Sequence, residues 1–478
     1  MRIADSYWGM AERILFVTGH LAEPRLRSLL AGMGETGFDW DVVDIGVQVA
    51  ALMTEPIIVR RLARPVQADR VVLPGRAGVD PERLSSEFGI PFERGPDELI
   101  DLPGYLGRAG RPPDLSRYDI RIFAEIVDAP RLEADGLLMR ARELRMQGAD
   151  VIDLGCKPGL AFPALEDAIR RIKAEGMQVS VDSGDPAELR RGAEAGADFL
   201  LSLTEATLDV AAGTAAVPVL IPATHGDLES LVRAASVARK RGIPHLLDPI
   251  LDPIHFGFTA SLLRYAALRE RLPDAQILMG TGNLTELTDA DSSGVTAVLM
   301  GVCSELAIGN VLVVQVSPHT RRTVAEHDVA RSMMYAARAN SDLPRNYGSA
   351  LLQVHDRAPF TQTPADIAAE AAQLRDANFR IATAADGVHV YSGRLHTVGH
   401  EALGFFPALD VAQDGAHAFY LGTELMKAEI ALSLGKRYAQ DEPLDWGCAA
   451  PRTSRDVTRL AEAGHTLRAK RGKRADDT

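Results

Sequence analysis

Residues 245–258 read HLLDPILDPIHFGF, a short apolar run followed by two Asp-Pro pairs and a glycine-containing turn. Leu246 and Leu247 have the character of a buried strand, and the two prolines prevent the chain from continuing as a helix. Asp248 and Asp252 are therefore expected at and beyond the carboxyl end of that strand. The pattern leaves two interpretations open: a pair of site carboxylates, or residues that close a turn and cap the next helix.

The same unit, a strand followed by a helix, repeats on both sides of this stretch. Strand patterns occur at 120–129, 150–159, 178–185, 198–205, 217–224, 245–252, 276–283 and 310–317. Helical patterns follow them at 131–147, 163–175, 186–195, 206–214, 228–241, 259–272, 292–307 and 323–339. Eight units of such even length predict an α/β fold of the (β/α)8 TIM barrel type, with an open doubly wound sheet as the alternative.

The segments that flank the barrel have different patterns and predict two further domains. Before it, strands and helices alternate as in a small doubly wound α/β domain of Rossmann or flavodoxin type. The turn after its first strand, Gly19-His20, lacks a glycine-rich phosphate-binding motif, so we expect no nucleotide cofactor. After the barrel, a helix, a hairpin and a long helix predict a small C-terminal α+β domain. The expected boundaries are 1–112, 113–340 and 341–460, with a basic flexible tail at 461–478.

Composition limits the classes of partner. The chain has 478 residues, a net charge of −13 and no apolar run long enough to span a membrane. A negative net charge without a basic face argues against general nucleic-acid binding. Three widely separated cysteines indicate neither a disulfide framework nor a zinc site. We expect a cytoplasmic protein with no nucleic-acid or membrane partner and no metal site that ligand spacing identifies.

Polar residues stand at nearly every predicted strand end, which is where TIM barrels place their active sites. These residues are Glu125, Asp128, Asp153, Lys157, Asp182, Ser202, Asp248, Asp252, Asn283, Gln315 and His319. A single Asp at such a place is often only a helix cap, as we expect for Asp185 before Pro186. A ring of hydrogen-bonding groups above an apolar barrel suits a planar heteroaromatic ligand.

Four of these strands resemble the pterin-binding barrel family, and within it dihydropteroate synthase. Residues 148–155, GADVIDLG, look like the family's GADIIDIGG strand, and residues 157–159, KPG, stand where the family has Arg-Pro-Gly. Residues 179–183, VSVDS, look like ISVDT, and residues 246–249, LLDP, look like ILDPG. Residues 278–283, LMGTGN, look like VGTSRK. The order and spacing of the matches are those of the family's barrel.

The chain departs from the family at other positions. Residues 124–129, AEIVDA, replace the NVTPDSF motif that holds diphosphate and magnesium in the family. Ser202 replaces a pterin-reading Asn, Asn283 replaces a Lys, and residues 314–317, VQVS, replace an Arg-x-His pair. The layout of three domains is similar to the dihydropteroate synthase-related proteins of tetrahydromethanopterin-making archaea and methylotrophic bacteria. In that route the arylamine carries a ribitol phosphate instead of a benzoate carboxylate, so the missing Lys would have no partner.

The resemblance implies a transferase of one-carbon metabolism. Its reaction joins a dihydropterin-6-methyl diphosphate to an arylamine of the aminophenyl-ribitol phosphate type in tetrahydromethanopterin biosynthesis. It implies that the pterin is bound by Asp182, Asp248, Asn283, Ser202, Asp153 and Gln315. Lys157 and His319 would be catalytic and, with Mg²⁺, would neutralise the diphosphate. Secondary candidates are Glu125, Asp128, Asp252 and Arg321. The partners would be the pterin, the arylamine and a second copy of the chain in a homodimer.

Two alternatives remain open at this point. A non-catalytic pterin-binding or assembly protein of the same pathway would explain the missing diphosphate ligands. A pterin-dependent methyltransferase would share the barrel and an Asn near the pterin ring, which Asn283 could supply. The chain has no DxHxxG cobalamin motif, so a methyltransferase would need a separate corrinoid partner.

Overall fold

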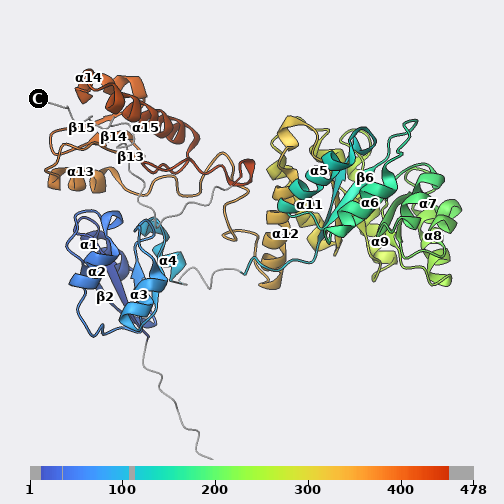
Figure 1. The fold of residues 1–478 in the computed structure, drawn as a ribbon, viewed down its shortest axis with the longest axis horizontal. Helices are drawn as coiled ribbons and strands as arrows, with labels where there is room; N and C mark the ends of the chain where they lie inside the picture. Colours follow the sequence, from blue (N-terminus) through green and yellow to red (C-terminus); the bar gives the residue numbers. More distant parts are fainter. Residues whose placement is uncertain (1–11, 35, 107–113, 452–478) are drawn as a thin grey trace, which may run out of the picture. The chain divides into compact units, whose positions relative to one another are not determined.

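The structure is a computed structural model that describes residues 12–34, 36–106 and 114–451 (Figure 1). It contains two compact units. Of the described residues, one unit comprises 12–34, 36–106 and 354–445, and the other comprises 114–353 and 446–451. The predicted basic tail, 461–478, lies outside the described residues.

The second unit is the predicted (β/α)8 barrel. Its strands are parallel and neighbour one another in the order β10-β9-β8-β7-β6-β5-β12-β11. A parallel bridge between Leu247 and Ile277 joins the two ends of this order, so the sheet curls into a nearly closed barrel. The strands are β5 (Arg121–Ile126), β6 (Val151–Gly155), β7 (Gln178–Asp182), β8 (Phe199–Leu203), β9 (Val217–Leu220), β10 (Leu246–Leu247), β11 (Leu278–Gly280) and β12 (Asn310–Val313).

Helices follow the strands, as predicted, with one difference. The α-helices are α5 (Ala134–Met146), α6 (Leu165–Ala174), α7 (Pro186–Glu194), α8 (Leu228–Lys240), α9 (Phe258–Arg271), α10 (Gly282–Thr285), α11 (Ser292–Glu305) and α12 (Thr323–Ala339). The helix predicted at 206–214 is present as the 3₁₀ helix η4 (Glu205–Ala211) and not as an α-helix. β-branched Thr207 and Val210 disfavour the α-helix, and Gly213 with positive φ ends the segment. Two shorter 3₁₀ helices follow β5 and β12, namely η3 (Ala129–Arg131) and η5 (Pro318–Thr320).

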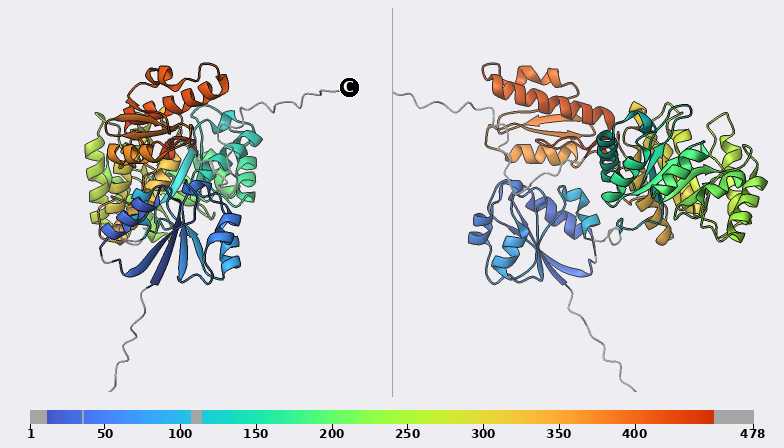
Figure 2. Two further views of the ribbon diagram at one scale, coloured as in Figure 1. Left: turned by 90° about the vertical axis from the view of Figure 1, so that its left-hand side faces the viewer. Right: turned by 45° about the vertical axis from the view of Figure 1, so that its right-hand side comes forward.

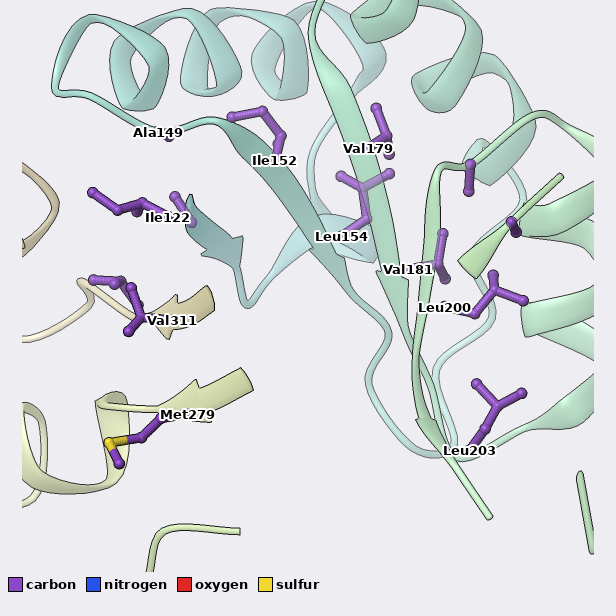
Figure 3. Close-up of a cluster of buried hydrophobic side chains, with 14 of the residues drawn as sticks. Ile122, Ala149, Ile152, Leu154, Val179, Val181, Leu200, Leu203, Met279 and Val311 are labelled. Atoms are coloured by element: carbon purple, nitrogen blue, oxygen red, sulfur yellow. The ribbon is translucent and has the colours of Figure 1, made fainter. Parts of the chain in front are cut away.

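Alternation along the strands separates the barrel into two apolar layers. Outward-facing residues such as Ile122, Ile152 and Leu200 pack in one large cluster against the helices, and Figure 3 shows them projecting from successive strands. Their neighbours form a second, smaller cluster that fills the barrel interior. The members of this interior cluster are Phe123, Val151, Phe199, Leu201, Val219, Leu246 and Leu278. The barrel is therefore a packed core and not a pore.

The N-terminal part of the first unit is a parallel four-stranded sheet with helices on both faces (Figure 2). Its strand order is β2-β1-β3-β4, as expected of a doubly wound domain. The elements are β1 (Glu12–Thr18), α1 (Glu23–Gly32), β2 (Phe38–Asp44), η1 (Ala50–Leu52), α2 (Glu55–Arg61), β3 (Arg70–Leu73), α3 (Pro81–Phe88), β4 (Phe92–Arg94), η2 (Leu99–Asp101) and α4 (Leu102–Tyr105). The short strand β4 was not predicted, since three residues carry no readable alternation.

The C-terminal part of the same unit is a three-stranded antiparallel sheet between helices. Its hairpin turns between β13 and β14, at the predicted Ala385-Asp386-Gly387. The long helix α15 packs on one face of the sheet through Leu421 and Leu425, and α13 packs on the other through Ile367. The elements are α13 (Pro364–Gln373), β13 (Arg380–Ala384), β14 (Gly387–Tyr391), β15 (His396–Gly399), η6 (Ala402–Phe405), α14 (Phe406–Leu409) and α15 (Gly415–Leu434). A last 3₁₀ helix, η7 (Gly447–Ala449), belongs to the barrel unit.

Candidate functional site

Four carboxyl groups stand above the apolar interior of the barrel, at the carboxyl ends of β5, β6, β7 and β10. Alternate residues of a strand face the same side. On three strands the acidic residue stands two positions after a residue of the apolar interior. These pairs are Phe123 and Glu125, Val151 and Asp153, and Leu246 and Asp248. On β7 the residue two positions before Asp182 is Ser180, which is buried but polar. We call Glu125, Asp153, Asp182 and Asp248 the mouth carboxylates.

Asp153 is the deepest of the mouth carboxylates and is fully buried. Its Oδ1 accepts a hydrogen bond from the Ser180 hydroxyl on the adjacent strand. Its Oδ2 is buried and has no hydrogen-bond partner among the described residues. A buried polar atom without a partner costs roughly 1–3 kcal/mol, so this oxygen is available to a ligand that brings a donor.

Glu125 lies against the backbone at the end of the neighbouring strand. A Cβ placed on Gly155 would come within 2.6 Å of Glu125 Oε1. A larger residue in place of Gly155 would have to displace the end of the Glu125 side chain. Gly155 therefore leaves room for the Glu125 carboxylate beside Asp153.

Asp182 is held by a strained neighbour. The Ser202 hydroxyl donates to Asp182 Oδ1 over 2.6 Å. Ser202 has a φ of 64°, and the register of β8 against β9 shifts between Leu200 and Leu203. Non-glycine residues with positive φ occur mostly where the surrounding structure imposes them, often at functional sites. The irregularity turns the Ser202 side chain toward the mouth.

Asp248 sits across the barrel from the other three. The hydroxyl of buried Tyr265 donates to Asp248 Oδ1 over 2.7 Å, and the Ile250 backbone N–H donates to the same oxygen over 2.8 Å. Ile250 has a φ of 67°, an uncommon conformation for a β-branched residue. The turn after β10 is thus built around one oxygen of Asp248.

Burial raises the pKa of every mouth carboxylate. Burial and the charge of Asp182 raise the pKa of Glu125 to about 7. Burial raises the pKa of Asp248 to about 6, although the hydrogen bond from Tyr265 lowers it. Burial, followed by the charges of Asp182 and Glu125, raises the pKa of Asp153 well above its usual range. Burial also raises the pKa of Asp182, against the hydrogen bond from Ser202.

Asp182 is the electrostatic centre of the group, since its charge raises the pKa of each of the other three. Like charges that share a site resist simultaneous ionisation. A ligand that presents several N–H donors, or a hard cation, would relieve this repulsion. The mouth is therefore suited to the donor edge of a heterocycle.

Removing one of these carboxyl groups is expected to change how stability depends on pH. A Glu side chain has a pKa of about 4.3 in an unfolded chain, and in the folded protein the pKa of Glu125 is about 7. The folded state binds more protons in this interval, so stability is lost as pH rises through it. Glu125→Gln should be more stable than the parent by about 2 kcal/mol at pH 8 and equally stable near pH 4. Urea unfolding at a series of pH values measures the difference.

The matched control for this pH series is Glu205→Gln. Glu205 stands beyond the end of β8, and its side chain is 45% exposed. The same substitution there should leave the pH dependence of stability unchanged. A Glu125→Gln effect that is equal at pH 4 and pH 8 would contradict a role for ionisation.

The loop between β10 and α9 is anchored by Asp252, which is 4% exposed. Arg264 donates to Asp252 Oδ2 over 2.7 Å and to the Ile250 carbonyl over 2.8 Å. His225 Nε2 lies 3.0 Å from Asp252 Oδ1. Both oxygens of Asp252 are thus engaged within the protein, whereas the second oxygen of Asp248 has no such contact among the described residues. Of the two acidic residues of the opening motif, Asp248 faces the mouth and Asp252 shapes the loop.

Two further residues expected to bind pterin make contacts with the protein itself. Asn283 is exposed, and its amide donates to the Leu251 carbonyl of the β10–α9 loop over 2.7 Å. Gln315 is buried, and its Oε1 accepts from the Val324 backbone N–H at the start of α12 over 3.3 Å. Asn283 keeps its carbonyl oxygen exposed to a ligand, while Gln315 contributes to the packing of α12.

The expected cationic residues do not converge on the mouth carboxylates. Lys157 is exposed and lines a separate cavity of about 610 Å³ between the loops that follow β6 and β7. His319 Nε2 lies 3.0 Å from the Thr285 carbonyl, and Arg321 is exposed at the end of η5. Asp128 is also exposed, 3.8 Å from Arg131.

Several residues of the site carried no readable signal in the sequence. Tyr265 lies on the buried face of a helix, where an aromatic side chain indicates core packing, and only its hydroxyl reveals contact with Asp248. Ser180 is likewise a small polar residue in an apolar strand. In the sequence, Arg264 cannot be distinguished from an arginine on the exposed face of a helix. Polar atoms within predicted apolar faces are the signal that could have identified Tyr265 and Ser180.

A separate set of possible metal ligands lies in the N-terminal domain. The ligand atoms of His20, Glu23 and Asp44 fall within 4.8 Å of one another at the carboxyl edge of the sheet. His20 is exposed, and Glu23 pairs with Arg27 over 2.9 Å.

Among the described residues, no helix is long and apolar enough to cross a membrane.

Two family models match parts of the chain. A family of unknown function (DUF6513) matches residues 12–97, and a family described as PterinBD-DUF4346 matches residues 407–441. An uncharacterized protein of Methanocaldococcus jannaschii is 25% identical over an alignment that covers 90% of this chain and 98% of that protein.

Solved structures resemble the chain over about half its length. A dihydropteroate synthase of Thermus thermophilus in complex with 6HMPPP is 23% identical and covers 47% of this chain and 95% of its own, with a TM-score of 0.36. A Yersinia pestis dihydropteroate synthase with a pterine-sulfa conjugate is 17% identical and covers 47% and 96%, with a TM-score of 0.35. A truncated 3-deoxy-D-arabino-heptulosonate 7-phosphate synthase of Thermotoga maritima is 16% identical and covers 47% and 88%, with a TM-score of 0.36. Likeness at this level carries no information on activity.

Proposed function

We propose that the barrel binds a pterin and joins a dihydropterin-6-methyl diphosphate to an arylamine, as a dihydropteroate synthase-like transferase of tetrahydromethanopterin biosynthesis. The observation that carries this proposal is the group of four carboxyl groups at the barrel mouth, of which Asp153 is buried and the other three are half-buried. The motifs around Asp153, Asp182 and Asp248, which resemble those of the pterin-binding family, support the same ligand.

The chemistry of the pterin edge matches the mouth. The amino-pyrimidinone side of a pterin presents neighbouring N–H donors, and carboxylates accept such bonds with charge assistance. Asp182 and Asp248 would take these donors from opposite sides of the barrel. Asp153 Oδ2, which has no partner among the described residues, would accept a further N–H. The Asn283 carbonyl oxygen would complete the contacts at the ring.

In the proposed reaction the arylamine nitrogen attacks the methylene carbon of the pterin. A C–N bond forms, the C–O bond to diphosphate breaks, and the diphosphate leaves with the electron pair. The nitrogen then loses a proton, and Glu125, with a pKa of about 7, is suited to accept it near neutral pH. Most of the rate enhancement would come from holding the two reactants in line.

Charge on the leaving diphosphate needs cations. Lys157 at the β6–α6 loop would supply one. His319 would supply another only after breaking its contact with the Thr285 carbonyl and turning toward the diphosphate. Oxygen ligands are those that Mg²⁺ prefers. Mg²⁺ held mainly by the diphosphate oxygens would offset the negative charge of the leaving group and leave Glu125 free to accept the proton.

The test is a turnover assay with the full chain, 6-hydroxymethyl-7,8-dihydropterin diphosphate and two arylamines. One arylamine is 4-aminobenzoate and the other is an aminophenyl-ribitol phosphate. We expect diphosphate release and a coupled product by mass spectrometry with the second amine, and at least tenfold slower reaction with the first. Pterin binding without diphosphate release with either amine would exclude the transferase.

A non-catalytic pterin-binding protein is the second candidate, and the placement of the cations favours it. Arg321 and Lys157 are exposed, and His319 is engaged with a backbone carbonyl. On this alternative, calorimetry would detect 6-hydroxymethylpterin binding that depends on Asp182. The turnover assay would show neither diphosphate release nor a coupled product. The two measurements together separate the candidates.

A further inference from the structure

The first unit contains a cavity of about 390 Å³ that is lined by residues of this unit alone. Its walls come from two segments that are distant in sequence, the N-terminal α/β sheet and the C-terminal antiparallel sheet. Cavities that hold small ligands have volumes of about 300–1,000 Å³, so the space is large enough for a compact organic molecule.

The cavity occupies the position where doubly wound sheets bind their ligands. In the order β2-β1-β3-β4, the chain passes from β1 to β2 on one side. It then crosses back to form β3 on the other side of β1. The place where the strand order reverses is the topological switch point of the sheet. Doubly wound sheets preferentially bind ligands in the crevice at the carboxyl ends of the strands there. Thr18 at the end of β1 and Leu73 at the end of β3 both line the cavity.

The C-terminal sheet covers this crevice. Ala382 and Thr383 of β13 and Tyr391 of β14 form part of the lining. Leu21, which follows β1, packs with Ile367 and Tyr391 in one apolar cluster. Arg25 on α1 donates to the Thr361 carbonyl. The C-terminal sheet therefore forms one wall of the crevice.

The lining combines apolar walls with one unused donor. Pro74 and Pro96 present flat apolar faces, and the Tyr391 ring adds an aromatic one. Arg76 pairs through Nη2 with Glu98, but its Nε is buried and has no partner among the described residues. Few buried donors in folded proteins lack an acceptor. A ligand oxygen in the cavity would satisfy this one.

Charges of both signs surround the cavity. The lining includes the basic residues Arg25, Arg76 and Arg380 and the acidic residues Asp97, Glu98 and Glu370. Arg76 pairs with Glu98 and Arg380 pairs with Asp376. Arg25 contacts the Thr361 carbonyl and has no ion pair with a carboxylate among the described residues. Arg25 is therefore the cation of the lining that is left to meet a ligand anion.

A nucleotide is a poor fit to the same place. Phosphates in doubly wound domains sit on the amino end of the helix that follows β1. Here that helix, α1, begins with Glu23 and Pro24. An acidic side chain in the first turn repels phosphate, and proline removes one of the N–H groups that would bind it.

We propose that this cavity is a second binding site, separate from the barrel mouth, for a small planar aromatic or heteroaromatic carboxylate. The ligand carboxylate accepts the Arg76 Nε–H and faces Arg25. Its ring lies between the proline faces and Tyr391. The site belongs to the unit that carries both family-model matches, and it does not depend on the function proposed for the barrel.

Isothermal titration of the full chain with 2-naphthoate tests the proposal. We expect one site per chain, at least tenfold weaker binding of the uncharged 2-naphthamide, and at least tenfold weaker naphthoate binding in Arg76→Gln. The control Arg83→Gln alters an exposed arginine of the same domain, 74% exposed, and should bind as the parent does. Asp248→Asn, at the barrel mouth, should also leave naphthoate binding unchanged.

A second variant keeps the test independent of Arg76. Ala382→Phe places a ring inside the cavity and should abolish naphthoate binding. Circular dichroism and a cooperative urea-unfolding transition like that of the parent verify that this variant folds. Absence of saturable naphthoate binding, equal affinity for the amide, or binding unaffected by both Arg76→Gln and Ala382→Phe would each overturn the proposal.

Discussion

Asp248→Asn is expected to weaken the binding of 6-hydroxymethylpterin by ~100-fold, measured by isothermal titration at pH 7.5. Asn keeps the size of the side chain and can still accept the hydrogen bonds from Tyr265 and the Ile250 backbone, so the turn after β10 should fold. What is lost is the negative charge that accepts the pterin N–H groups. A charge-assisted hydrogen bond contributes about 1.5–3 kcal/mol, and the upper part of that range corresponds to this factor.

The effect should depend on pH in a defined direction. The pKa of Asp248 is about 6, so the parent carboxyl group is ionised at pH 7.5 and largely protonated at pH 5. The difference between parent and variant should therefore shrink as pH falls through 6. Asp209→Asn, on the exposed end of η4, makes the same chemical change away from the mouth and should bind pterin as the parent does. Parent-like affinity of Asp248→Asn would remove Asp248 from the pterin site.

Arg264→Met is expected to lower the free energy of unfolding of the barrel by about 3 kcal/mol. The side chains of Arg264 and Asp252 are 15% and 5% exposed. Breaking a buried ion pair by removing one partner typically costs about 3–5 kcal/mol, because the remaining charge stays buried without compensation. His225, 3.0 Å from Asp252, offsets part of that cost. Urea unfolding followed by circular dichroism gives the value.

The double variant Arg264→Met/Asp252→Asn distinguishes this explanation from a simple loss of packing. With the carboxylate also removed, more than half of the lost stability should return. Arg241→Met breaks the exposed pair with Asp209 and should cost less than about 0.5 kcal/mol. Equal losses in the single and double variants would mean that the Arg264 side chain acts through its packing alone. The pterin affinity of Arg264→Met would also show whether the loop between β10 and α9 helps to position Asp248.

The repeat pattern predicted the barrel because its signals are local. Each strand is a run of apolar residues and each helix has a 3.6-residue period, so both can be read within a short window. The eight predicted strands all occur in the structure. Local signals fail where the element is too short to show a period, as at β4, and where neighbouring β-branched residues decide between helix types, as at η4.

Candidate residues at the strand ends were also readable, but their roles were not. Asp248 and Asp252 stand four residues apart in nearly identical LDP contexts. The positive φ of Ile250 and the contacts of Arg264 place one toward the mouth and the other inside the loop. Similarly, nothing local to Gln315 or His319 indicates that each meets a backbone group of another segment.

What the sequence by itself determined about this protein is the succession of strands and helices, and which residues end each strand. The tertiary structure alone decided how each strand-end carboxylate is held, because that depends on partners such as Tyr265 and Ser202 contributed by other strands and helices. It also decided that the two flanking segments, more than 240 residues apart in the chain, form one unit around a common cavity. Contacts between distant segments depend on the packing of side chains in three dimensions, and no periodicity within a short stretch encodes them.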